Sequence, residues 1–241
     1  MKHRFSWIFI FITITGFSGP ALATSAITIS TFEEDTAVVR ASQLLEKAYE
    51  NIGVEMKLIR FPANRALVEA DNGDLSEGEL IRIGGLSRQF HNLIQVPVMI
   101  AKFKISVFSK DIDFPVNGWQ SLQPYQIAFK RGFKGMEKHA DNLNVTRVTS
   151  SGTAMEMLSL DRIELIVLPY LDGLVLRKQL NLPQIRVLNP PLEQVNLYHY
   201  IHKKNKGIAD RLTVELGTMA QNGEIAQFWK NIEDELSAMD D

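Results

Sequence analysis

The strongest constraint on this chain is an alternation of short apolar runs with segments of helical periodicity. Residues 26–30 and 54–61 are rich in the apolar and β-branched side chains typical of strands. Between them, residues 36–52 predict a helix, because apolar residues recur at spacings of three and four: Val38, Ala41, Leu45, Ala48 and Ile52. A second helix is expected from Pro62 to Asn72-Gly73. This order predicts an α/β sheet with parallel strands.

The pattern changes in the middle of the chain and then resumes. Residues 93–109 form a long β-rich stretch that contains Pro97. The elements expected after it are strands at 126–130, 145–149, 165–168, 185–188 and 195–201, and helices at 133–140, 153–160, 171–180 and 208–236, the last with a break at Asn222-Gly223. Two α/β series joined by two extended crossings predict two lobes, with a cleft between them that would enclose a small ligand.

Composition narrows the class of protein. The 241 residues are 45% hydrophobic and 22% charged, values that exclude a disordered chain and a coiled coil. The net charge is −2, and −4 without Lys2 and Arg4. The chain therefore lacks the net positive charge that would attract nucleic acid or an anionic membrane. The absence of cysteine excludes disulfides, thiolate metal sites and cysteine nucleophiles.

The first 23 residues have the features of a secretory signal peptide. The chain starts with basic residues, residues 7–17 are almost wholly apolar, and Ala21 and Ala23 are the small residues that a signal peptidase reads. This apolar run is shorter than the ~20 residues of a membrane-spanning helix. Cleavage is expected after Ala23, and because no cysteine follows to take a lipid anchor, the compartment is expected to be a Gram-negative periplasm.

Several short stretches share their order and spacing with one protein family. They are residues 61–67 (FPANRAL), 72–74, 78–79, Arg88 ahead of Val96-Pro97, 127–132, 157–158, 161–167 and 219–223. Together they resemble the bacterial solute-binding proteins of family 3, the polar-amino-acid type that serves ABC importers. The resemblance implies the type II periplasmic-binding-protein fold, with two α/β lobes, a two-strand hinge and closure around a solute in the cleft. Residues 24–104 and 194–241 are expected in the first lobe and 105–193 in the second.

Candidate ligand-binding residues follow the expected strands, because ligands of open α/β sheets lie beyond the carboxyl ends of the strands. In the first lobe, Phe32 would supply an apolar wall and Arg82 a positive charge. Arg65 could bind the ligand or be a solvated helix charge. The resemblance places Arg88 near the arginine that clamps a ligand carboxylate in similar proteins, a task that suits a planar guanidinium.

In the second lobe, the turn at Arg131 offers backbone N–H groups and an arginine to an anion. Ser151 and Thr153 could bind the ligand or merely cap a helix, since Thr153 and Glu156 have the spacing of a capping box. Tyr170 could stack on the ligand or pack in the core.

One departure from the family bears on the ligand. The resemblance implies an aspartate just past the strand at 165–168, where it holds the ligand's amino group, but this chain has Pro169-Tyr170 there. Burying an ammonium without a carboxylate is costly. This argues against a standard amino acid and favours another carboxylate-bearing solute, unless Glu33 or Asp172 replaces the aspartate.

The function expected from these features is capture of a small polar, carboxylate-bearing solute, an amino acid or a related compound, for an inner-membrane ABC permease. A second hypothesis is a sensory receptor for a membrane signalling partner, and a third is a dehydratase-type enzyme with Glu33 as general acid or base. The chain carries none of the common hydrolase, protease or nucleotide-binding motifs. His199 and His202 have a metal-like spacing, but on a strand they would point to opposite faces. We therefore expect a monomeric binding protein with no catalytic residue, no cofactor, no metal and no nucleic-acid partner.

Overall fold

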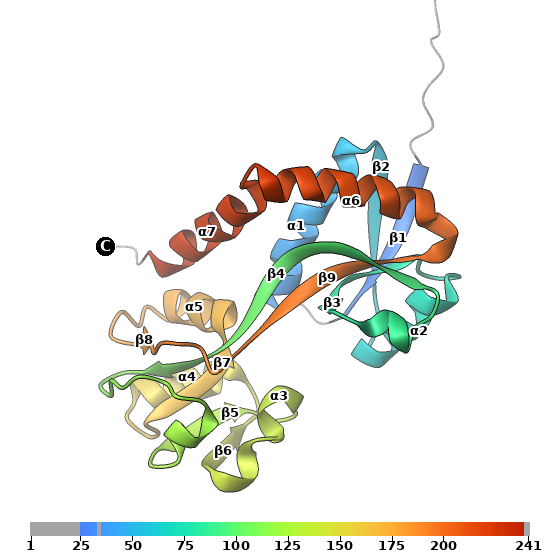
Figure 1. Ribbon diagram of the computed structural model, residues 1–241. Coiled ribbons are helices and arrows are strands. Elements are labelled where there is room, and N and C mark those ends of the chain that lie inside the picture. Colours follow the sequence, from blue (N-terminus) through green and yellow to red (C-terminus); the bar gives the residue numbers. More distant parts are fainter. Residues whose placement is uncertain (1–24, 33–34, 239–241) are drawn as a thin grey trace, which may run out of the picture.

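Two α/β lobes joined by two long crossing strands make up the molecule (Figure 1). The computed structural model describes residues 25–32 and 35–238. The expected signal peptide and the candidate Glu33 lie outside the described residues.

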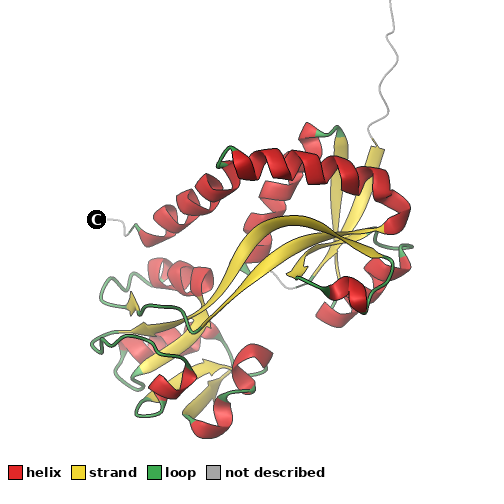
Figure 2. Ribbon diagram, viewed as in Figure 1, coloured by secondary structure: helices red, strands yellow, loops and turns green. Residues whose placement is uncertain are grey.

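The first lobe is a parallel sheet covered by helices (Figure 2). Its elements are β1 (Ser25–Thr31), α1 (Thr36–Asn51), β2 (Val54–Arg60), α2 (Ala63–Asn72) and β3 (Gly78–Ile83). Strand β1 pairs in parallel with both β2 and β3, which confirms the predicted βαβα arrangement. Helix α1 begins where the Asp35 carboxylate accepts the N–H of Val38, and its Ala41, Leu45 and Ala48 are fully buried in the lobe's core.

The second lobe repeats this architecture. Its elements are β5 (Gln126–Lys130), α3 (Lys134–Glu137), β6 (Asn144–Val148), α4 (Ser151–Ser159), β7 (Leu165–Pro169) and α5 (Tyr170–Gln179). Strand β5 pairs in parallel with β6 and β7. The middle of β7 is entirely buried, as its continuous apolar sequence predicts.

Two helix predictions in the second lobe are wrong in detail. Helix α4 is capped by Ser150, which has an extended backbone and whose hydroxyl oxygen accepts the N–H of Thr153 at 3.0 Å, so the predicted capping box at Thr153 does not form. Helix α3 is a single turn followed by a 3₁₀ turn at Ala140–Asn142, instead of a helix over 133–140.

The hinge consists of β4 (Leu93–Ser109) and β9 (Glu193–His202), which pair antiparallel and run from one lobe into the other (Figure 1). They unite both lobes in one sheet of order β2-β1-β3-β9-β4-β7-β5-β6, with the short β8 (Arg186–Val187) beside β4. Pro97 has no N–H to donate, and the ladder shifts register around it, between Gln95 and Met99.

The C-terminal helices contact both lobes. Helix α6 (Lys206–Gln221) packs on the first lobe, with Leu212 and Leu216 in its core. After the break at Asn222-Gly223, α7 (Glu224–Ser237) continues toward the second lobe, where Ile232 and Leu236 join the core around Phe108 (Figure 1). The end of the chain therefore ties the lobes together.

Candidate functional site

A cavity of about 580 Å³ lies between the lobes beside the crossing strands. Its walls come from the first lobe, the hinge and the second lobe in turn: Phe32 and Arg82, Phe103 and Glu193, Phe133 and Lys138. The volume falls within the roughly 300–1,000 Å³ of small-molecule sites, and the mixture of aromatic walls with a few charged groups is typical of them. We call this space the interlobe cavity.

Three contacts hold the Arg82 side chain in the interlobe cavity. Its Nε lies 2.8 Å from Glu79 Oε1, its Nη2 donates to the carbonyl of Ala63 at 2.8 Å, and its guanidinium carbon lies 3.7 Å from the centre of the Phe32 ring. The pairing of β1 with β3 sets Ser30 beside Glu79, and the Ser30 hydroxyl donates to Glu79 Oε2 at 2.5 Å. Arg82 therefore keeps one orientation before any ligand arrives.

Burial sets the protonation behaviour of this pair. The Glu79 side chain is fully buried, and this burial raises its pKa to about 7 despite the opposing effects of Arg82 and Ser30. Burial likewise lowers the pKa of Arg82, and Glu79 acts against that shift. Within the part of the chain that the structure describes, Nη1 of Arg82 has no hydrogen-bond partner, so it can donate to a ligand.

Glu193 supplies a second fixed charge to the same cavity. Its Oε1 accepts from Trp119 Nε1 at 3.0 Å and lies 2.9 Å from His139 Nε2 and 3.2 Å from Lys138 Nζ. The Trp119 and His139 rings are stacked with centroids 4.3 Å apart. Although burial raises the pKa of Glu193, the hydrogen bonds from these side chains outweigh it and lower the pKa, so the carboxylate is ionised.

A second, more open space of about 710 Å³ lies at the carboxyl ends of β5 and β7. Lys130 and Ser151 line it from the second lobe, and Asp35 and Thr36 line it from the first. At this point Asp172 Oδ1 accepts the backbone N–H of Thr36 at 3.0 Å, which joins the N-terminal ends of α5 and α1. This hydrogen bond between the lobes occupies one carboxylate oxygen of Asp172. Asp172 is one of the two residues considered above as a replacement for the aspartate that the family resemblance implies.

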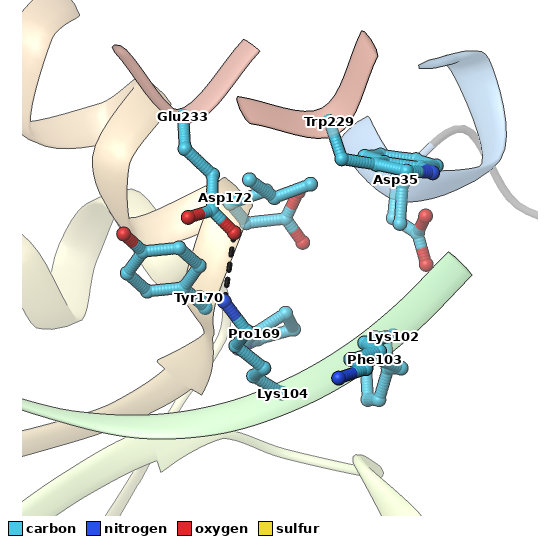
Figure 3. A pocket seen from close by; sticks show the side chains of 11 residues that line it. Asp35, Lys102, Phe103, Lys104, Pro169, Tyr170, Asp172, Trp229 and Glu233 are labelled. Carbon is cyan, nitrogen blue, oxygen red and sulfur yellow. Dashed lines mark hydrogen bonds and ion pairs between the residues drawn. The ribbon is translucent and has the colours of Figure 1, made fainter. Parts of the chain in front are cut away.

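A small third cavity, about 100 Å³, lies where α5, α7 and β4 meet (Figure 3). Lys104 forms an ion pair with Glu233 at 2.7 Å, and its ammonium lies 4.7 Å from the centre of the Tyr170 ring. The indole of Trp229 donates to the carbonyl of Ile100 at 2.7 Å. These contacts hold α7 against the hinge.

The structure brings some of the predicted residues together and separates others. Phe32 and Arg82 meet in the interlobe cavity, Ser151 lines the neighbouring open space, and Tyr170 lines the small cavity near α7. Thr153 bonds to Ser150 through both its backbone N–H and its hydroxyl.

Three predicted arginines lie on the surface. Arg65 is exposed and pairs with Glu69 at 3.1 Å, as a solvated helix charge does. Arg88 is exposed in the 3₁₀ turn Leu86–Arg88 and does not line the interlobe cavity. Arg131 is also exposed, in the turn after β5.

Sequence reasoning missed Glu193 and its supporting side chains. Trp119 and His139 lie 74 and 54 residues away from it along the chain, so no local motif marks the cluster. The only available signal was an acidic residue two positions before the predicted strand at 195–201.

His199 belongs to the core. Its Nδ1 donates to the carbonyl of Leu80 at 2.9 Å, and its Nε2 therefore accepts from the Tyr49 hydroxyl at 2.8 Å. Burial lowers the pKa of His199 to about 4, so the ring is neutral. Among the described residues no group of three metal-ligating side chains is placed to hold an ion.

Sequence comparison finds a distant relative of this chain. No family model matches the chain. An uncharacterised protein of Shewanella oneidensis is 23% identical over 193 residues, which cover 76% of this chain and 72% of that protein.

None of the helices described here has the length and apolar character needed to cross a membrane.

Solved structures match over most of the chain at low identity. The L-cystine solute receptor of Neisseria gonorrhoeae has a TM-score of 0.66 and 10% identity, covering 87% of this chain and 93% of that one. A histidine kinase sensor domain with similarity to periplasmic binding proteins has a TM-score of 0.61 and 9% identity, covering 86% and 95%. The GluR0 ligand-binding core of Nostoc punctiforme, solved with L-glutamate, has a TM-score of 0.60 and 14% identity, covering 85% and 98%.

These matches define the class of fold. The chain has the type II periplasmic-binding-protein fold, as its sequence predicts.

Proposed function

We propose that the protein is a periplasmic solute-binding protein that captures a small carboxylate-bearing solute for an ABC importer. The observation that carries this proposal is the interlobe cavity, in which Arg82 is held by Glu79 and Phe32 with one nitrogen left for a ligand. The fold supports it, since two of the similar structures named above are an L-cystine solute receptor and a ligand-binding core solved with L-glutamate. In this proposal the protein catalyses no reaction, acts as a monomer, and reaches the periplasm through cleavage after Ala23.

Binding follows from the physical chemistry of the cavity. A ligand carboxylate accepts a charge-assisted hydrogen bond from Arg82 Nη1, which is stronger than a hydrogen bond between neutral groups. The apolar part of the solute packs against Phe32, Phe103 and Phe133, which come from the first lobe, the hinge and the second lobe. Because one ligand touches all three, binding favours the arrangement in which the lobes are close together.

Thermal unfolding against a library of amino acids, organic acids, oligopeptides and sugars tests this function. A solute at 100 times its Kd stabilises the protein by about 2.7 kcal/mol, which gives a shift of several degrees. The proposal expects at least one carboxylate-bearing solute to produce such a shift. A library in which no solute stabilises the protein would overturn it.

Two comparisons of variants with the wild type test which arginine binds the ligand. Arg88→Met should leave the shift unchanged, because Arg88 lies outside the interlobe cavity. The double variant Glu79→Gln/Arg82→Met should abolish it, while Glu79→Gln alone retains it. The double variant avoids leaving Glu79 buried without its partner, which could prevent folding.

The likeness to a histidine kinase sensor domain favours a second candidate function, a receptor that reports solute occupancy to a membrane signalling partner. Solute uptake by cells with and without the protein separates the two roles. Loss of uptake supports the importer, whereas retained uptake together with a lost transcriptional response to the solute supports the sensor.

A further inference from the structure

We propose that Glu79 and an anionic solute compete for the Arg82 guanidinium, and that Glu79 takes up a proton from the surrounding buffer when such a solute binds. The interlobe cavity then holds its solute more tightly in acidic than in alkaline surroundings. This inference rests on the proposed function, because it assumes that a solute carboxylate contacts Arg82, and it adds a regulation of that site by pH.

Two carboxylates share one cation when a solute is bound. Glu79 Oε1 accepts from Arg82 Nε at 2.8 Å and is fully buried, whereas Arg82 lines the interlobe cavity and has Nη1 left for a solute. Among the described residues, Arg82 is the charged side chain that acts on the pKa of Glu79. A solute anion therefore sets two negative charges against one positive charge, and protonation of one carboxylate removes the repulsion between them.

Glu79 is the carboxylate that takes the proton. Burial raises its pKa to about 7 before any solute arrives, whereas an ordinary carboxylic acid has a pKa of about 4. A solute anion on the same guanidinium raises the pKa of Glu79 further, because a nearby like charge disfavours the ionised form. Above pH 7, where free Glu79 is ionised, binding of the anion therefore brings a proton with it.

The hydrogen bonds around Glu79 suit the protonated form as well as the ionised one. The Ser30 hydroxyl oxygen lies 2.5 Å from Glu79 Oε2, 2.9 Å from the carbonyl of Gly78 and 3.0 Å from the carbonyl of Ala66. When Glu79 is ionised, the one hydrogen of this hydroxyl points to Oε2. When Oε2 is protonated, Glu79 donates to Ser30 and Ser30 donates to a carbonyl. The proton is thus accommodated by turning one hydroxyl.

Arg82 keeps its place when Glu79 is neutral. Oε1 of a protonated Glu79 still accepts from Nε, and the carbonyl of Ala63 still accepts from Nη2 at 2.8 Å. The Phe32 ring still lies 3.7 Å from the guanidinium carbon. Protonation therefore removes the competing charge and leaves the group that binds the solute in position.

The other ionisable groups around Glu79 do not supply this titration. On β9, Tyr200 pairs with Glu79, and burial raises the pKa of its phenol, so it stays neutral. Its neighbour His199 has a pKa of about 4 and is neutral above that pH. The remaining charges nearby form ion pairs of their own: Arg65 with Glu69 on α2, and Glu77 with Lys204.

Calorimetric titration of the purified protein at pH values from 5.5 to 8.5 tests this proton uptake. The probes are 3-phenylpropionate and 4-methylpentanoate, which have an apolar body, one carboxylate and no group that titrates in this range. The affinity should fall with rising pH, by up to about 10-fold for each unit by which the bound anion raises the pKa of Glu79.

The same titrations count the protons. At pH 8, the measured enthalpy should depend on the ionisation enthalpy of the buffer and should indicate uptake of about half a proton or more for each probe bound. At pH 5.5 the uptake should be close to zero, because free Glu79 is already protonated there. This count needs the wild-type protein alone.

Variants assign the proton to Glu79. In Glu79→Gln the affinity should no longer change with pH, and proton uptake should be absent. A merely structural role of Glu79 would instead change the affinity by the same factor at every pH. Glu46→Gln, on the exposed face of α1, is the control and should keep the pH dependence of the wild type.

Three results would overturn the inference. They are an affinity that is constant from pH 5.5 to 8.5, a proton uptake that persists in Glu79→Gln, and failure of both probes to bind at any pH. If carboxylate-bearing solutes of the thermal library still stabilise the protein in any of these cases, the proposed function stands and only the proton uptake is wrong. If no solute in that library binds, both proposals fail.

Discussion

Replacing Glu79 by glutamine should change how the protein's stability depends on pH. Burial raises the pKa of Glu79 from 4.5 to about 7 in the folded state. The folded protein then holds a proton that the unfolded chain has lost, so the stabilisation from protonated Glu79 is complete below pH 4.5 and disappears as the pH rises to 7. At about 1.4 kcal/mol for each pKa unit, the loss amounts to about 3 kcal/mol. Glutamine cannot titrate, so the Glu79→Gln variant does not undergo this loss of stability.

The assay is urea unfolding of the wild type and Glu79→Gln at half-unit steps from pH 4 to pH 8, followed by tryptophan fluorescence. The difference between the two proteins cancels the contributions of other titrating groups. Relative to the wild type, the variant should gain about 3 kcal/mol in free energy of unfolding between pH 4.5 and 7. Parallel profiles would contradict this prediction and would mean that Arg82 keeps Glu79 ionised throughout.

His199 contributes a slope of the opposite sign in the wild type. Burial lowers its pKa from 6.5 to about 4, so the unfolded chain binds a proton that the folded protein excludes, and stability falls as the pH drops from 6.5 to 4. The Glu79 and His199 effects therefore oppose one another between pH 4.5 and 6.5. In Glu79→Gln the His199 slope is no longer opposed, and stability should rise with pH across this window.

Two further predictions concern the contacts between and within the lobes. Asp172→Ala removes the acceptor for the N–H of Thr36 and should lower the free energy of unfolding by about 1 kcal/mol. It should also increase the radius of gyration measured by solution scattering. Unchanged scattering would show that this bond does not hold the lobes together. Gly173→Ala would set a Cβ atom 2.0 Å from the ring of buried Phe108 and should lower stability by at least 1–3 kcal/mol on the usual scale of overpacking. The control is Gly217→Ala on α6, where the added Cβ atom has no neighbour within 4 Å and the substitution should raise stability by up to about 1 kcal/mol. Equal effects of the two substitutions in urea unfolding would contradict the packing argument.

The sequence predicted the elements well because their signals are local. The apolar periodicity of α1, the run of β7 and the break at Asn222-Gly223 each lie within a few residues of the feature they determine. The path of α7 was not predictable in this way. Its apolar face shows that the helix is buried on one side, but only the folded chain shows that Ile232 and Leu236 pack on the second lobe.

The strand-end rule predicted two of the residues that line the interlobe cavity. Phe32 and Arg82 come at the ends of β1 and β3, so their placement in one cavity could be inferred from the order of strands. Glu193 stands at the beginning of a hinge strand, to which this rule does not apply. Arg88 was chosen by family likeness, and the turn that carries it faces solvent.

In the proposed function, Arg82 holds a solute between the two lobes. The most direct measurement is a crystal structure of the protein with the solute that stabilises it most in the thermal library. We predict that the solute lies in the interlobe cavity, with a carboxylate oxygen within hydrogen-bonding distance of Arg82 Nη1 and its apolar part in contact with Phe32 and Phe133. A solute bound to one lobe alone, away from Arg82, would contradict the claim.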